Sequence, residues 1–123
     1  MFDPNAPTPS RHKGYSGEDK AADYLIKSGY EIISRNFQSK KGEIDCIAKD
    51  EKGTLVFIEV KYAKSYAKGH PAFWVTWGKQ RKLVAMAKRY LGDHRLASQP
   101  CRFDVIAIVG GKIEHIKNAF LAY

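Results

Sequence analysis

Polar and apolar positions alternate at the spacing of a helix in two segments of the chain, residues 16–28 and 76–92. The stripe of the first segment contains Glu18, Ala22 and Leu25, and the stripe of the second contains Leu83, Met86, Ala87, Tyr90 and Leu91. Both segments therefore predict amphipathic helices that turn one face towards a core.

The first predicted helix has an acid on its apolar side. Ser16 is a candidate N-cap, with Asp19 at the capping-box position and Gly29 at the position that follows the helix. With these ends, Glu18 falls on the apolar stripe, opposite the charged face of the helix. A carboxylate that faces a core needs a partner or a function.

Five further segments have the alternation or the short apolar runs of β-strands. They are residues 30–37, 43–49, 54–61, 102–109 and 112–116, with a short terminal turn expected at 118–122. The order α-β-β-β-α-β-β predicts an α/β fold in which helices flank a mixed β-sheet.

The composition fits one globular domain. The 123 residues, 44% of them hydrophobic and 28% charged, suffice for one core. Residues 1–13 hold three of the five prolines, so we expect a flexible N-terminal tail at 1–13 and a single domain at 14–123. Since no run of about 18 apolar residues occurs, we expect no membrane span, and the first residues lack the apolar stretch expected of a secretion signal. Cys46 and Cys101 lack CxxC spacing and are expected to be buried thiols of a cytoplasmic protein.

The net charge of +8, with a pI near 9.5, favours polyanionic partners. Nucleic acid is the first expectation and an anionic membrane surface the second.

A tight turn predicts the register between the second and third strands. Residues 51–53 fit a three-residue hairpin loop with glycine at its left-handed position. Counting outwards from this loop places Asp45 opposite Glu59 and Glu43 opposite Lys61, with the four side chains on one face.

The third strand is apolar on both faces, which indicates an interior strand covered on both sides. Glu59 and Lys61 therefore end a buried strand. A cross-strand ion-pair ladder is one explanation of these charges, but several acids near one lysine repel each other. A Mg²⁺ or Mn²⁺ ion held by Asp45 and Glu59 would compensate that repulsion.

Such a site suggests phosphodiester hydrolysis. A bound metal would polarise the scissile phosphate and lower the pKa of a bound water. Lys61 would orient or deprotonate that water, or neutralise the charge that develops on the phosphate. Because acidic surroundings oppose the lowered pKa that a lysine base requires, we favour the electrostatic role.

The spacing of three charged residues resembles the motif of the PD-(D/E)xK nuclease superfamily. Asp45 is followed by thirteen residues and then by Glu59-x-Lys61, and Ile44 stands in place of the motif's proline. A longer string, from Gly17 to Phe120, resembles the YraN-like family of small bacterial proteins. It comprises GEDKAADYL, GYEIISRNF, KGEID, FIEVK, a basic helix start at 79–82, RFDVIAI and NAF. That family is similar to archaeal Holliday-junction resolvases, which are dimeric.

The resemblance implies a restriction-endonuclease-like fold and a possible homodimer. It implies four catalytic positions: Glu18, Asp45, Glu59 and Lys61. Glu43 and Gln80 are implied to lie close by in a supporting role, with Lys79 as the alternative to Gln80. Tyr62 stands where many relatives have arginine. It therefore lacks the positive charge with which an arginine at this position would contact a phosphate.

Aromatic residues alternate with lysines in residues 62–75, and the second helix begins with basic residues. We expect nucleic-acid contacts from Tyr62, Lys64, Tyr66, Lys68, Lys79, Arg81 and Lys82. Packing onto the core or onto a second subunit is the alternative for the aromatics. That alternative is favoured for Trp77 and stays open for Tyr62 and Tyr66.

Together these features predict a metal-dependent, endonuclease-like protein that hydrolyses phosphodiester bonds in DNA, with branched or junction DNA as a candidate substrate. The competing hypothesis is a non-catalytic nucleic-acid-binding or assembly module on a nuclease scaffold. An RNA substrate is a third hypothesis.

Overall fold

A computed structural model describes residues 16–121 of the protein, and the predicted tail lies outside the described residues. Its elements in chain order are α1 (Gly17–Lys27), β1 (Glu31–Ser39), β2 (Gly42–Lys49), β3 (Leu55–Ala63), the short 3₁₀ helix η2 (Pro71–Phe73), α2 (Trp77–Asp93), β4 (Cys101–Val109) and β5 (Lys112–Phe120). The predicted order α-β-β-β-α-β-β is confirmed. Within residues 16–121, neither α-helix is both long enough and apolar enough to cross a membrane.

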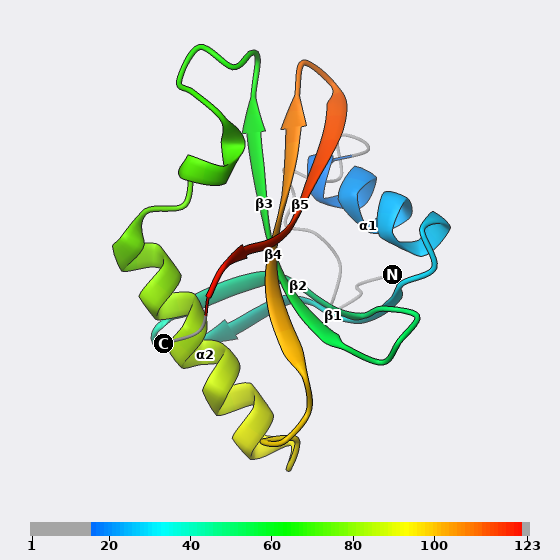
Figure 1. Ribbon diagram of the computed structural model, residues 1–123, viewed down its shortest axis with the longest axis vertical. Helices are drawn as coiled ribbons and strands as arrows, with labels where there is room; N and C mark the ends of the chain where they lie inside the picture. The colour runs from blue at the N-terminus through cyan, green and yellow to red at the C-terminus, as the bar shows by residue number, and fades with distance from the viewer. Residues whose placement is uncertain (1–15, 122–123) are drawn as a thin grey trace, which may run out of the picture.

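The five strands form one mixed sheet in the order β1-β2-β3-β4-β5. The β3–β4 pair is parallel and the other pairs are antiparallel. A parallel pair needs a crossover connection, which α2 supplies. Figure 1 shows α1 and α2 on opposite sides of the sheet, with the loop after β3 at one end.

The central strand β3 is buried on both faces, as predicted. Leu55 and Phe57 pack in the core beneath α2, whereas Val56 and Ile58 pack in the core beneath α1. Both predicted helix stripes face these cores, and the whole α2 stripe is buried. This arrangement leaves the end of β3, with Glu59 and Lys61, between the two layers.

The ends of α1 and of the β2–β3 hairpin form as the sequence predicts. The Ser16 hydroxyl accepts a hydrogen bond from the Asp19 N–H, and the Asp19 carboxylate accepts one from the Ser16 N–H. In the hairpin, Gly53 has a φ of 88°, a conformation that side chains with a Cβ disfavour. The Asp50 N–H donates to the Thr54 carbonyl across this turn.

The predicted terminal turn at 118–122 is wrong in its described part, because β5 continues to Phe120. The register shifts between the Val105–Ile116 and Phe103–Phe120 pairs, so the strand contains a bulge. Asn118, with a φ of 55°, lies in this bulge and donates its N–H to the Asp104 carboxylate at 2.9 Å. The hydrogen bond to the buried Asp104 carboxylate holds Asn118 in the sheet, where the sequence pattern predicts a turn.

Asp104 is the centre of a buried charged network that the sequence patterns did not predict. Its carboxylate accepts hydrogen bonds from the Arg102 guanidinium at 3.0 Å and contacts His115 Nε2 at 2.7 Å. Arg102 also donates to Asp50 at 2.7 Å and to the Tyr30 hydroxyl at 2.6 Å. Burial alone would raise the pKa of Asp104, but the bonds from His115, Arg102 and Asn118 outweigh it and the pKa is lowered.

We expect Asp104→Ala to lower the free energy of unfolding by about 3–5 kcal/mol at pH 7, because it removes the buried carboxylate that pairs with both Arg102 and His115. The pKa of Asp104 is lower in the folded chain, so its stabilisation is present at neutral pH. It declines as the pH falls below about 4, the pKa of the unfolded chain, and is lost once the pH passes the lower pKa of the folded chain. Urea unfolding at pH 7 and pH 3 tests both statements.

The matched control is Asp93→Ala, which removes an exposed carboxylate that lies 3.7 Å from Arg89. This variant should keep the unfolding midpoint of the wild type. An equal loss in both variants, or a loss from Asp104→Ala that does not shrink at low pH, would contradict the assignment.

Candidate active site

The β2–β3 ladder follows the predicted register but ends at the Cys46–Ile58 pair, one step before Asp45 and Glu59. Beyond that pair the Asp45 side chain replaces a backbone acceptor: its Oδ2 accepts a hydrogen bond from the Val60 N–H at 2.8 Å. The two strands therefore separate where the acids begin.

The start of α1 approaches the end of β3 at the same point. A Cβ atom on Gly17 would collide with the Tyr62 ring, so the absence of a side chain allows this close approach. The next residue is Glu18, which is therefore brought to the separated strands. The close approach of Gly17 to Tyr62 thus explains why Glu18 points inwards, as the helical stripe predicts.

Three carboxylates converge at this position. One oxygen each from Glu18, Glu43 and Asp45 lies within 4.8 Å of the others, and all three residues are half-buried. Oxygen ligands around one Mg²⁺, at about 2.1 Å from the ion, are roughly 3–4 Å apart. We call these three residues the carboxylate cluster.

Glu59 lies next to the cluster but has different partners. Glu59 is 5% exposed, and its Oε2 atom is 3.6 Å from both Lys61 Nζ and Lys79 Nζ. Its Oε1 is buried and has no hydrogen-bond partner among the described residues. Buried polar atoms are nearly always satisfied, so an exception of this kind is typical of a functional site.

The pKa of Asp45 is raised to about 6, first by burial and then by repulsion from the Glu59 carboxylate. The Val60 N–H and the Lys79 ammonium oppose the shift without cancelling it. The nearby N–H group and lysine therefore do not fully balance the negative charge of the carboxylates at this end of the sheet.

The donor set fits a hard divalent cation. Three converging carboxylate oxygens and one unpartnered buried carboxylate oxygen are the ligand chemistry of Mg²⁺ or Mn²⁺. The structure brings Glu18 and Glu43 to Asp45, whereas it turns Glu59 towards two lysines. Metal binding by Asp45 and Glu59 stays a prediction, and the geometry adds Glu18 and Glu43 as candidate ligands.

Most of the predicted nucleic-acid residues after β3 line one groove. This groove, of about 590 Å³, lies beside Lys61 and is bounded by Tyr62, Lys64, Lys68 and Trp74. Tyr66 is held elsewhere: its hydroxyl donates to the Glu114 carboxylate at 2.6 Å. Glu114 also contacts His70 at 2.8 Å, so it anchors the loop to β5.

The basic start of α2 divides its side chains among different neighbours. Lys79 reaches Glu59, whereas the Gln80 side-chain amide donates to the Val75 carbonyl at 3.0 Å. Of the two alternatives, Lys79 is therefore the one that lies beside the predicted site. Arg81 and Lys82 are exposed. Packing of Trp77 onto the core is wrong, because its side chain is 61% exposed, whereas packing onto a second subunit stays a prediction.

Residues 17–108 match the profile described as "Uncharacterised protein family UPF0102". The chain belongs to this family. The predicted resemblance to the YraN-like family is thereby confirmed. A relative from Lachnoclostridium phytofermentans is 47% identical over 112 residues, covering 90% of this chain and 94% of the relative. A relative from Persephonella marina is 47% identical over 108 residues, covering 88% and 92%. Both carry the name UPF0102 protein.

Two solved structures resemble the fold at a lower level. One, titled "Structure of EndoMS-dsDNA2 complex", matches with a TM-score of 0.43 and 12% identity over 75% of this chain and 36% of that chain. The other, a repair endonuclease from Pyrococcus abyssi, matches with a TM-score of 0.41 and 17% identity over 85% and 39%. The chain thus spans under two fifths of each. Scores at this level assign no activity to the chain.

We expect Asp45→Asn to stabilise the protein in chelator by about 1–3 kcal/mol at pH 7. The reason is that an ionised carboxylate whose pKa is raised to about 6 destabilises the folded state. The matched control, Asp23→Asn, makes the same change on the exposed face of α1 and should have no comparable effect. Denaturant unfolding in EDTA measures the difference.

Added Mg²⁺ should raise the unfolding midpoint of the wild type more than that of Asp45→Asn, because the ion binds only the folded cluster. A loss of stability in Asp45→Asn, or equal gains from Mg²⁺ in both proteins, would argue against a metal site at this position.

Proposed function

We propose that this protein is a divalent-metal-dependent nuclease that hydrolyses phosphodiester bonds in DNA. The observation that carries the proposal is the convergence of Glu18, Glu43 and Asp45 within 4.8 Å, beside the Glu59–Lys61 pair. The PD-(D/E)xK-like spacing of Asp45, Glu59 and Lys61 supports the same chemistry, and the resemblance to resolvases is the reason for preferring DNA.

In this proposal Glu18, Glu43 and Asp45 hold Mg²⁺ or Mn²⁺, and Glu59 offers its unpartnered Oε1. The ion, when bound, supplies polarisation of a phosphate oxygen and a water of lowered pKa. The Val60 N–H fixes the orientation of Asp45, because it donates to one oxygen of the carboxylate at 2.8 Å.

Lys61 has an electrostatic role in the proposal. Its ammonium lies 3.6 Å from the buried Glu59 carboxylate, which restrains it beside the cluster. From there it opposes the negative charge that grows on a phosphate during attack. Lys79, at the same distance from Glu59, adds a second cation at this point.

The groove bounded by Tyr62, Lys64, Lys68 and Trp74 is proposed to bind the substrate backbone. It begins at Lys61, so a strand lying in it would pass the carboxylate cluster. Lysines neutralise phosphates and exposed aromatic rings accept bases. The net charge of +8 favours the approach of a polyanion.

We expect labelled DNA to be cut in Mg²⁺ or Mn²⁺ and left intact in EDTA. Single-stranded, duplex and four-way-junction substrates should be compared. Asp45→Asn should abolish cutting, and Lys61→Ala should slow it by about 10²–10³-fold, the usual loss when one stabilising charge or donor is removed. Lys52→Ala, in the hairpin loop between β2 and β3, is the matched control and should cut at the wild-type rate.

Equal residual cutting by wild type and both site variants would indicate a contaminant and refute the proposal. Metal-independent binding of DNA with no cutting of any substrate would instead favour the non-catalytic module. Cutting of RNA alone would overturn the choice of DNA while leaving the metal site standing.

A further inference from the structure

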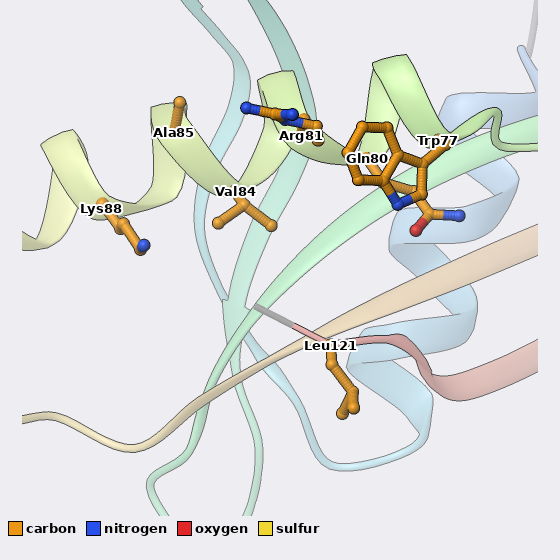
Figure 2. Close-up of a pocket in the computed structure, with 7 residues that line it drawn as sticks. All are labelled: Trp77, Gln80, Arg81, Val84, Ala85, Lys88 and Leu121. Atoms are coloured by element: carbon orange, nitrogen blue, oxygen red, sulfur yellow. The ribbon is translucent and has the colours of Figure 1, made fainter. Parts of the chain in front are cut away.

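A second groove lies along the exposed side of α2. It has a volume of about 440 Å³ and shares no lining residue with the groove beside Lys61. Figure 2 shows its side chains on α2, with Leu121 across from them. We call it the α2 groove, and its main lining residues are Trp77, Gln80, Arg81, Val84, Lys88 and Leu121.

The exposed Trp77 ring is the most unusual feature of this groove. A side chain of this size is normally buried, yet 61% of it is exposed, and Leu121 is 58% exposed. The Arg81 guanidinium carbon lies 4.7 Å from the Trp77 ring centroid. By contrast, the indole N–H of Trp74 is bonded to the Gly69 carbonyl at 3.2 Å. Trp77 therefore offers an aromatic surface with a cation already placed beside it.

The charge of the groove distinguishes between possible occupants. It is lined by two cations, Arg81 and Lys88, and by no acid. The sequence of α2 contains one acid, Asp93, against five lysines and arginines. If a second copy packed across this face, like charges would oppose each other, which disfavours that occupant. A polyanion with flat apolar groups matches both the cations and the indole.

We propose that the α2 groove binds an unpaired segment of a nucleic-acid strand, with a base stacked on Trp77 and phosphates held by Arg81 and Lys88. The base must be unpaired, because both faces of a base inside a duplex are already stacked. Such stacking on an aromatic ring tolerates any base. The proposal rests on the proposed function in that its ligand is the nucleic acid on which the nuclease acts.

The position of the groove defines the substrate class. From Trp77 to Lys88 the helix rises about 16 Å, a length that accommodates a few nucleotides. Lys79, two residues after Trp77, reaches Glu59 beside the carboxylate cluster. A strand in the α2 groove would therefore lead towards the predicted site. This connection favours DNA with a single-stranded segment beside the position of cleavage over fully paired DNA.

Trp77 supplies its own probe, because the chain has two tryptophans. In a Trp74→Phe background Trp77 is the sole indole, and single-stranded oligothymidylate added in EDTA should quench its fluorescence. Trp77→Ala, measured by anisotropy of a labelled strand, should weaken binding by about 5- to 100-fold. Trp77→Phe should retain most of the affinity, since it keeps an aromatic face.

Arg81→Ala should also weaken binding and should reduce its salt dependence by about one counterion. The matched control is Arg89→Ala, which removes the same charge from the same helix. Arg89 is paired with Asp93 and lies outside the α2 groove. This variant should bind like the wild type.

Unchanged single-strand affinity in Trp77→Ala would overturn the proposal. So would a fall in sedimentation mass of Trp77→Ala without loss of affinity, which would make a second copy the occupant. Cutting of duplex DNA with no dependence on Trp77 would refute the groove and leave the nuclease intact. Trp77-dependent strand binding without metal-dependent cutting would support the groove and refute the nuclease. No binding of any nucleic acid would refute both.

Discussion

The repulsion among carboxylates at the end of β3 is the constraint on which this site depends. Glu18, Glu43 and Asp45 converge where β2 leaves its ladder with β3, and Glu59 is buried beside them. The Asp45 carboxylate accepts a hydrogen bond from the Val60 N–H, so this backbone group stays satisfied where the two strands separate. The sheet thus opens at its most acidic point.

Two buried acids on neighbouring strands show what distinguishes this site from ordinary structure. Asp104 on β4 is fully enclosed, but Arg102, His115 and the Asn118 N–H satisfy it at 2.7–3.0 Å, and its pKa is lowered. Glu59 on β3 has two lysines at 3.6 Å, and its other oxygen has no hydrogen-bond partner within residues 16–121. The first arrangement stabilises the sheet by itself. The second lacks that internal balance, which is the condition under which an external cation adds stability.

Local sequence patterns predicted much of the fold and of the candidate site, whereas features that depend on contacts between distant residues were missed. The 51–53 loop gave the correct hairpin register, and helical spacing correctly turned Glu18 inwards. The end of the β2–β3 ladder and the bulge at Asn118 depend on side chains that accept backbone N–H groups from distant residues. No periodicity encodes such contacts. Packing onto the core or onto a second subunit is favoured for Trp77 because aromatic residues usually fill cores and interfaces, and only the position of α2 reveals that this ring lies outside the core.

The basic start of α2 shows why a short motif can serve several purposes. Consecutive helical residues are about 100° apart, so Lys79, Gln80 and Arg81 point in different directions from the helix axis. Lys79 reaches the buried Glu59, Gln80 holds the Val75 carbonyl, and Arg81 lies against Trp77. The buried stripe of the helix fixes this rotation, because turning α2 by one residue would withdraw Leu83 and Tyr90 from the core. Core packing therefore determines which cation faces the carboxylates and which faces the groove.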